Sequence, residues 1–97
     1  MLFAISCLDK PDHGAVRAEI RPAHLAFLEA NAARIKIAGP YLDDGGARMI
    51  GSLLVIEADD DAEARAFAEA DPYARAGLFE SVAIRPWKWV IGQPGDA

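Results

Sequence analysis

Two residues far apart in the chain, His24 and Asp71, have the side-chain types that best suit proton-transfer chemistry. Imidazole changes its protonation state near neutral pH, so a histidine can serve there as a base or as an acid. A carboxylate bonded to one ring nitrogen fixes the tautomer and stabilises the imidazolium, which leaves the other nitrogen free to exchange a proton with a substrate. The pair therefore predicts general acid/base catalysis, provided that the fold brings the two side chains together.

Each residue of the pair also has a purely structural interpretation. His24 falls on the shoulder of an apolar helical stripe, where a half-buried histidine needs no chemical role. Asp71 precedes Pro72, and an aspartate before a proline is typical of a helix start, where the carboxylate caps free backbone N–H groups. The two roles of Asp71 are compatible, because one oxygen can cap the helix while the other holds His24.

Three further residues are candidate substrate ligands. Arg21 and Tyr73 flank the pair in sequence and can contact substrate oxygens, although a stacked or solvated surface position is the simpler explanation for each. Ser52 follows Gly51, and either a place in the same pocket or the close packing of a small residue explains it.

Other kinds of site find little support in the sequence. The two histidines and the single cysteine lack the ligand spacing of a zinc site, and there is no glycine-rich phosphate loop, nucleophile elbow or dinucleotide fingerprint. We therefore expect neither a metal nor a cofactor. Cys7 lies in an apolar segment, which is typical of a structural thiol. Trp87 and Trp89 can stack on an aromatic ligand, but core or dimer packing is their more ordinary use.

Composition limits the partners and the compartment. The 97 residues include 15 acidic and 10 basic side chains, for a net charge of -5, and the basic ones are scattered. No nucleic-acid partner is expected, because nucleic-acid binding requires a clustered basic surface. No segment approaches the ~20 apolar residues of a membrane span, and a lone cysteine fits a reducing compartment. We expect a cytoplasmic protein with one domain over residues 1–97, frayed at 92–97, and no membrane contact.

The elements that must position these residues follow from the apolar patterns. Strands are predicted at residues 2–8, 35–42, 49–58 and 79–91. In the region 13–34, Pro22 is expected to separate a short helical turn ending at Ile20 from a main helix that starts near the proline. That helix should bury a stripe on one side and leave Phe27 exposed on a monomer. The stripe comprises Leu25, Leu28, Ala32 and Ile35.

Turn and cap signals complete the order. The Asp-Gly and Gly-Gly pairs in residues 43–47 predict an antiparallel hairpin, and Pro40 places its first strand at an edge or a bulge. Asp60 and Glu63 resemble a capping box for a second helix ending near Ala70. A further helical turn begins at Pro72 and stops at Gly77.

Strand, helix, strand, strand, helix, strand is the α+β, ferredoxin-like βαββαβ arrangement, with a four-stranded antiparallel sheet. Two helices cover only one face of such a sheet, yet the first, third and fourth strands carry apolar residues at successive positions. We therefore expect a homodimer that packs the uncovered sheet faces together by two-fold symmetry.

Five motifs occur together in this chain: Arg21-Pro22-Ala23-His24-Leu25, Ala38-Gly39-Pro40, Gly51-Ser52, Ala70-Asp71-Pro72-Tyr73 and Arg85-Pro86-Trp87. Their order and separations resemble the YCII-related (YciI-like) family of small bacterial proteins over nearly the whole chain. The resemblance implies a dimeric α/β barrel, related in fold to muconolactone isomerase, with a pocket that contains a histidine and an aspartate at the positions of His24 and Asp71. A family relative in chloroaromatic degradation is a dehydrochlorinase, while most members have no assigned reaction.

Two hypotheses for function follow. The first is a cofactor-independent isomerase, lyase or dehydrochlorinase that uses His24 and Asp71 on a cyclic or aromatic metabolite. The second is a non-catalytic dimeric domain that binds a small ligand or assists a neighbouring enzyme, since no dedicated nucleophile, metal or phosphate motif is present.

Overall fold

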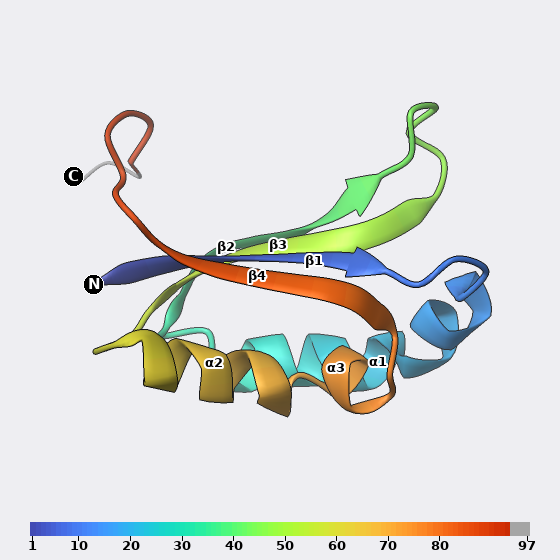
Figure 1. Ribbon diagram of the computed structural model, residues 1–97, viewed down its shortest axis with the longest axis horizontal. Coiled ribbons are helices and arrows are strands. Elements are labelled where there is room, and N and C mark those ends of the chain that lie inside the picture. Colours follow the sequence, from blue (N-terminus) through green and yellow to red (C-terminus); the bar gives the residue numbers. More distant parts are fainter. Residues whose placement is uncertain (94–97) are drawn as a thin grey trace.

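A four-stranded antiparallel sheet with helices on one side forms the framework of the protein (Figure 1). The computed structural model describes residues 1–93, so most of the expected frayed tail, from residue 94 on, lies outside it. The elements in chain order are β1 (Leu2–Asp9), α1 (Gly14–Ala30), β2 (Ile35–Leu42), β3 (Met49–Glu57), α2 (Asp61–Ala70), α3 (Pro72–Arg75) and β4 (Phe79–Trp87). The sheet order is β2-β3-β1-β4, which confirms the ferredoxin-like α+β fold.

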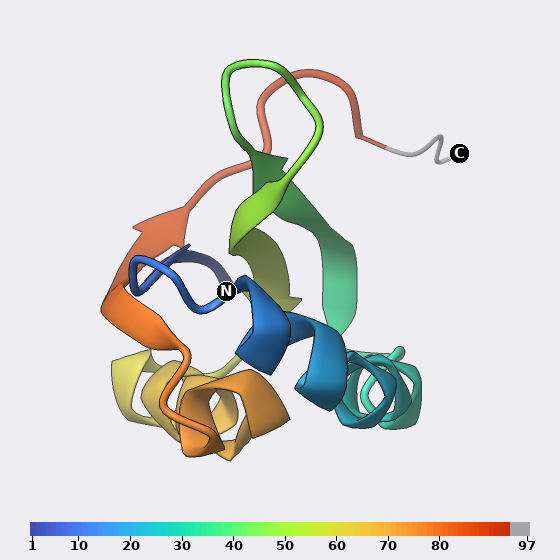
Figure 2. The same ribbon diagram turned by 90° about the vertical axis from the view of Figure 1, so that its right-hand side faces the viewer.

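Helix α1 differs from the prediction. It runs through Pro22 as one helix of 17 residues, where the sequence pattern indicated two separate pieces. A proline inside a helix removes one backbone hydrogen bond and bends the axis, and Figure 2 shows the first turns of α1 running at an angle to the rest. The helix carries a buried side chain on each side of the bend, Arg17 before it and His24 after it, and this burial favours a helix that continues through Pro22. Tertiary packing therefore converts the predicted break into a kink.

The buried face of α1 also differs from the predicted stripe. Leu25 is 48% exposed, and Ala32 and Ile35 lie beyond the end of the helix. Phe27, expected to be exposed, is partly buried and packs against Phe67 of α2 with ring centroids 5.0 Å apart. The sequence pattern did not indicate which side of α1 packs against α2. The contact between Phe27 and Phe67 shows that it is the side that carries Phe27.

The β2–β3 hairpin forms as predicted. β2 is an edge strand, so the missing N–H of Pro40 removes no hydrogen bond from the interior of the sheet. At the turn, Asp43 accepts hydrogen bonds from the backbone N–H groups of Ala47 and Arg48, and Gly46 takes a positive φ of 74°. The β2–β3 turn therefore lies at the same end of the sheet as the loop after β1 (Figure 1).

Strand β4 ends at Trp87, four residues before the predicted end at Ile91. Its partner β1 begins at Leu2, which lies opposite Trp87, so no backbone of β1 is available to pair with residues further along. Val90 and Ile91 are consequently 76% and 88% exposed.

The caps of the second half follow the sequence signals. The Asp60 side chain accepts a hydrogen bond from the Glu63 N–H, and the Glu63 carboxylate accepts one from the N–H of Asp59. Asp71 caps α3, and Gly77 ends this segment with a φ of 75°. No helix within residues 1–93 is long and apolar enough to cross a membrane.

The core lies between the central strands and the helices. Its fully buried members are Phe3, Ile5, Cys7, Leu54, Ile56, Ala58, Ala64 and Phe67. Successive strand residues point to opposite faces, so Ala4, Ser6 and Leu8 of β1 lie on the other face of the sheet, together with Leu53 and Val55 of β3. We call this second side the open face, because all three helices lie on the opposite side (Figure 1).

Burial of Cys7 predicts an inert thiol. Its side chain is 3% exposed, and desolvation, aided by the negative charges of Asp71 and Asp9, raises the pKa of the thiol to about 12. Because the thiolate is the nucleophile, alkylation by iodoacetamide at pH 8 should be at least about a hundredfold slower in the native protein than in denaturant. Mass spectrometry of timed samples measures both rates. Equal rates would show that Cys7 is accessible in the native state.

Candidate active site

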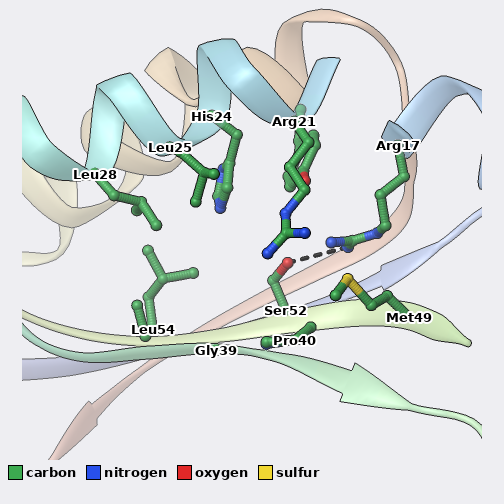
Figure 3. A pocket seen from close by; sticks show the side chains of 12 residues that line it. Arg17, Arg21, His24, Leu25, Leu28, Gly39, Pro40, Met49, Ser52 and Leu54 are labelled. Carbon is green, nitrogen blue, oxygen red and sulfur yellow. Dashed lines mark hydrogen bonds between the residues drawn. The ribbon is translucent and has the colours of Figure 1, made fainter. Parts of the chain in front are cut away.

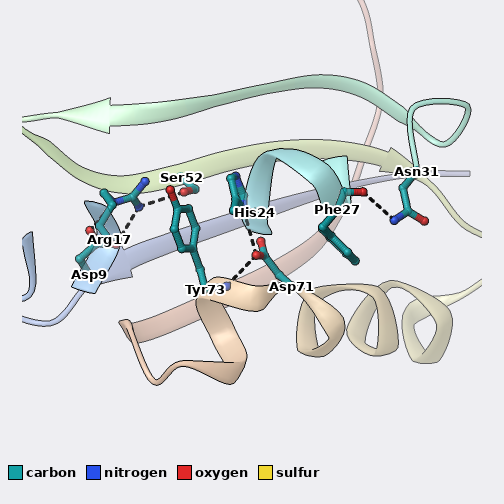
Figure 4. Close-up of polar contacts among 8 residues, drawn as sticks. All are labelled: Asp9, Arg17, His24, Phe27, Asn31, Ser52, Asp71 and Tyr73. Carbon is teal, nitrogen blue, oxygen red and sulfur yellow. Dashed lines mark hydrogen bonds and ion pairs between the residues drawn. The ribbon is translucent and has the colours of Figure 1, made fainter. Parts of the chain in front are cut away.

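A cavity of about 170 Å³ lies between α1 and the strands β2 and β3 (Figure 3). Its polar lining consists of Arg17, Arg21, His24, Ser52 and Tyr73. Its apolar lining includes Leu25, Leu28 and Leu54. Four of the five predicted site residues thus border one cavity, and the fifth, Asp71, lies behind His24 (Figure 4).

His24 and Asp71 are in direct contact across 47 positions of sequence. His24 Nδ1 lies 2.9 Å from Asp71 Oδ1, and the two residues are 7% and 4% exposed. A carboxylate can only accept hydrogen bonds, so this contact requires the proton of a neutral His24 ring to be on Nδ1. The Nε2 atom is then the ring nitrogen with a free lone pair.

The same Asp71 oxygen also caps helix α3. Oδ1 accepts a hydrogen bond from the Tyr73 N–H at 2.9 Å, so a single atom performs the two tasks that the sequence pattern divided between two oxygens. The cap fixes the side chain of Asp71 relative to the backbone of α3. The orientation of His24 is therefore tied to the start of α3.

Tyr73 lies flat against the His24 ring. The ring centroids are 3.9 Å apart with an angle of 17° between the planes, and Tyr73 is 1% exposed. Burial raises the pKa of the Tyr73 phenol against the opposing positive charges of Arg17 and Arg21. Tyr73 therefore keeps its proton at neutral pH. Its stacked ring also holds the imidazole of His24 in one plane.

Arg17 is a central member of the site that the sequence analysis missed. Its Nε and Nη2 donate to the two carboxylate oxygens of Asp9 at 2.7 and 2.9 Å, and Nη2 also donates to Ser52 Oγ at 3.1 Å (Figure 4). Its guanidinium carbon lies 4.5 Å from the centre of the Tyr73 ring. Burial alone would lower the pKa of Arg17, but the hydrogen bonds and charge of Asp9 raise it, so the side chain stays cationic.

A signal for Arg17 was present in the sequence. Arg17 and His24 are seven residues apart, which is two helical turns and hence the same face of a continuous helix. The expected break at Pro22 concealed this relation, because it assigned the two residues to different helices.

The remaining nitrogen of His24 faces the cavity. Figure 3 shows the ring directed from α1 toward the space above β3. Within residues 1–93, every buried side-chain nitrogen or oxygen has a hydrogen-bond partner, and His24 Nε2 makes no such contact, so Nε2 is accessible from the cavity. Ser52 is 3% exposed and Arg21 is exposed at the mouth. Over the same residues, no three His, Cys, Asp or Glu side chains lie together as metal ligands.

Sequence comparison finds relatives that match nearly the whole chain. Protein YciI of Escherichia coli is 39% identical over 98 aligned positions, which cover 94% of this chain and 100% of that protein, and the Shigella flexneri protein of the same name matches equally well. An uncharacterised protein of Haemophilus influenzae is 32% identical with the same coverage.

Two solved structures are also similar. The 5-chloro-2-hydroxyhydroquinone dehydrochlorinase TftG of Burkholderia phenoliruptrix, in complex with 2,5-dihydroxybenzoquinone, is 40% identical with a TM-score of 0.86, over 91% of this chain and 94% of TftG. PA3566 of Pseudomonas aeruginosa shares the fold at 15% identity and a TM-score of 0.52, over 92% of this chain and 93% of PA3566. The model of the YCII-related domain matches residues 1–88, and the chain therefore belongs to the YCII-related family.

Proposed function

We propose that this protein is a small-molecule enzyme in which His24, oriented by Asp71, transfers a proton on a cyclic or aromatic substrate. The reaction class is a cofactor-independent isomerisation or elimination, and dehydrochlorination is the favoured elimination. The observation that carries the proposal is the 2.9 Å contact between His24 Nδ1 and Asp71 Oδ1, with Nε2 of the same ring open to a cavity.

The side chains around His24 suit a base that takes up a proton, becomes positively charged and then releases the proton again. When Nε2 takes a proton, the positive imidazolium is stabilised by the carboxylate of Asp71. The stacked Tyr73 ring and the cap on Asp71 hold the base in one position, which lowers the cost of aligning it with a substrate. Ser52 and Arg21 supply hydrogen-bond donors at the wall and the mouth of the cavity.

The cavity has the size and the polarity for one six-membered ring. Its volume of about 170 Å³ is comparable to the roughly 150 Å³ of an engineered cavity that binds benzene. Leucine side chains can contact the ring, while the polar wall can bind hydroxyl or carbonyl oxygens. Such a ring compound is named as the substrate of TftG, 5-chloro-2-hydroxyhydroquinone, and another, 2,5-dihydroxybenzoquinone, is bound in its structure.

Loss of HCl from a chlorinated dihydroxy ring balances without an oxidant. The base first moves a proton from one ring hydroxyl to the carbon that carries chlorine, which makes this carbon tetrahedral and turns the C–O(H) group into a carbonyl. It then removes the proton of the second hydroxyl, the released electron pair moves through the ring to form a new double bond at the same carbon, and the carbon–chlorine bond breaks with both of its electrons on chloride. The ring is left at the quinone level, and the base returns its proton to water. His24 is the residue that we assign to this proton transfer.

Replacing either member of the pair should abolish most turnover. With 5-chloro-2-hydroxyhydroquinone as the first substrate and chloride release as the readout, His24→Ala and Asp71→Asn should each lower kcat/KM by about 10²–10⁴-fold. Asn retains a capping oxygen for α3, so Asp71→Asn tests the charge and the tautomer of His24 with little effect on folding. Asp61→Asn, an equivalent change at an exposed position of α2, is the matched control.

Several outcomes would reject this mechanism. If His24→Ala and Asp71→Asn both turned over the substrate at the wild-type rate, the pair would have no catalytic role. Tight retention of an aromatic ligand without product, in a broader screen of ring compounds, would favour the non-catalytic binding domain instead. Thermal unfolding of each variant separates loss of the pair from loss of the fold.

We also infer a homodimer that buries the open face. Leu8, Ile37 and Trp87 are large apolar side chains on this face, and they are 47%, 41% and 38% exposed. The hydroxyl groups of Ser6 and Tyr41 lie 2.9 Å apart there, so they satisfy each other without water. Half-exposed apolar side chains around a mutually hydrogen-bonded polar pair support a two-fold sheet-on-sheet interface.

Close packing within the open face depends on Gly51. A Cβ atom at this position would overlap the backbone oxygen of Cys7 in β1 and would lie 3.0 Å from Tyr41 Cδ2, so glycine permits both the close approach of β1 and the position of the tyrosine over β3. The side chain of Tyr41 thereby fills the surface over β3. The resulting surface suits contact with a second copy.

A charge at Ile37 should dissociate the dimer. Sedimentation equilibrium at micromolar concentration should give twice the chain mass of 10.4 kDa for the wild type, and one chain mass for Ile37→Lys, because a lysine on the open face would be buried without a partner. Val82→Lys is the control, since Val82 is equally exposed, at 42% against 41% for Ile37, but points to the helix side of the sheet. A monomeric wild type would remove the inferred dimer.

The extent of the domain and its compartment are further inferences. The family match over residues 1–88 supports one domain for residues 1–97. The single cysteine, which is free and buried, supports a reducing compartment, and we therefore assign the protein to the cytoplasm.

A further inference from the structure

A second hollow, of about 470 Å³, opens beside the candidate active site. It shares Arg17, Arg21 and Met49 with the 170 Å³ cavity, so the two spaces are adjacent. Its walls are the loop between β1 and α1, the first turns of α1 and the start of β3 after the hairpin turn. The hollow therefore lies within reach of one part of a molecule whose other part occupies the cavity.

Basic side chains predominate around this hollow. Lys10, Arg21 and Arg48 line it, and within residues 1–93 none of them forms an ion pair. Its carboxylates are Asp9 and Asp12. The charge of Asp9 is balanced by Arg17 in a pair whose side chains are 6% and 8% exposed, so three unpaired cations face one free carboxylate.

This local charge opposes the charge of the whole protein. The chain carries a net charge of -5, so a general attraction for anions is not expected of its surface. Asp43, the other carboxylate near Arg48, is engaged by backbone N–H groups at the hairpin turn and does not line the hollow. The positive potential is therefore concentrated at the mouth of the site.

The start of helix α1 adds to the positive potential. Gly14, its first residue, lines the hollow. No side chain caps this end of α1, and its first turn contains no acidic residue. Uncapped N–H groups at a helix N-terminus favour negative charge. His13 also lines the hollow, and its Nδ1–H donates a hydrogen bond to the carbonyl oxygen of Pro11 at 2.8 Å.

We propose that this hollow is an anion subsite, in which Lys10, Arg21 and Arg48 bind a carboxylate or phosphate group of the substrate while its ring occupies the cavity at His24. The proposal rests on the function proposed above and specifies its substrate class as ring compounds with an acidic substituent. Arg21 lines both spaces, so it can contact the ring oxygens and the acidic group of one molecule. Lys10 and Arg48 contribute from two loops that meet only in the fold.

Inorganic phosphate is the direct probe of this subsite. In a titration followed by amide NMR shifts, phosphate should perturb residues 10–14 and 47–50 in the wild type. The double variant Lys10→Gln/Arg48→Gln should bind about tenfold more weakly or not at all, because two charge-assisted contacts are lost. Arg65→Gln/Arg75→Gln removes the same charge from exposed positions of α2 and α3 and should bind like the wild type. Absence of a localised response, or equal affinity in Lys10→Gln/Arg48→Gln, would overturn the subsite.

A matched pair of ring compounds tests whether the bound anion belongs to the substrate. 4-Hydroxyphenylacetate and 4-hydroxyphenylacetamide differ in charge but hardly in shape. The acid should displace phosphate, perturb the amides of Ser52, Leu54 and Tyr73 as well, and bind about tenfold more tightly than the amide. Equal binding of the two compounds would show that the hollow takes a separate anion, and it would overturn the assigned substrate class.

His24→Ala separates the anion subsite from the proposed chemistry. This variant lacks the base but keeps every basic side chain of the hollow, so its phosphate response should match that of the wild type. If the wild type bound phosphate at the hollow but turned over none of the ring compounds, the subsite would stand and the proposed reaction would be removed. If the wild type turned over a ring compound but showed no localised phosphate binding, the proposed reaction would stand and the subsite would be removed.

Discussion

Asp71 Oδ1 accepts two hydrogen bonds, and the arrangement of the site depends on this one atom. The bond from the Tyr73 N–H starts helix α3, and the bond from His24 Nδ1 orients the imidazole. The start of α3 then places the Tyr73 ring against the His24 ring. A capping interaction that the local sequence selects for stability therefore also determines which nitrogen of His24 faces the cavity.

Arg17 provides the complementary constraint at the other side of the cavity. An ion pair with its side chains less than a tenth exposed is stable only where hydrogen bonds replace the lost water, and Arg17 meets this requirement with Asp9 and Ser52. These contacts link the end of β1, the first turns of α1 and the middle of β3. Because α1 continues through Pro22, Arg17 and His24 are held at a constant separation along one helix.

The one-sided arrangement of helices connects the site to the proposed assembly. The helices cover the face of the sheet that contains Phe3, Ile5 and Cys7, and the cavity lies on this same side. The open face is left with half-exposed apolar side chains and a closed Ser6–Tyr41 hydroxyl pair. A dimer through the open face would therefore leave the cavity and its basic mouth on the outer, helix-covered side of each subunit.

The sequence by itself determined the order of elements, the β2–β3 hairpin, and the caps at Asp60 and Asp71. Each of these depends on residues within a few positions of one another, so local backbone chemistry is sufficient to specify it. Only the tertiary structure decided that α1 passes through Pro22, that β4 stops where β1 has no partner for it, and that Arg17 joins the site. These features depend on packing and pairing between distant segments. For the same reason, the 2.9 Å approach of His24 to Asp71 could be proposed from residue types and family resemblance, but only the folded chain supplies its geometry.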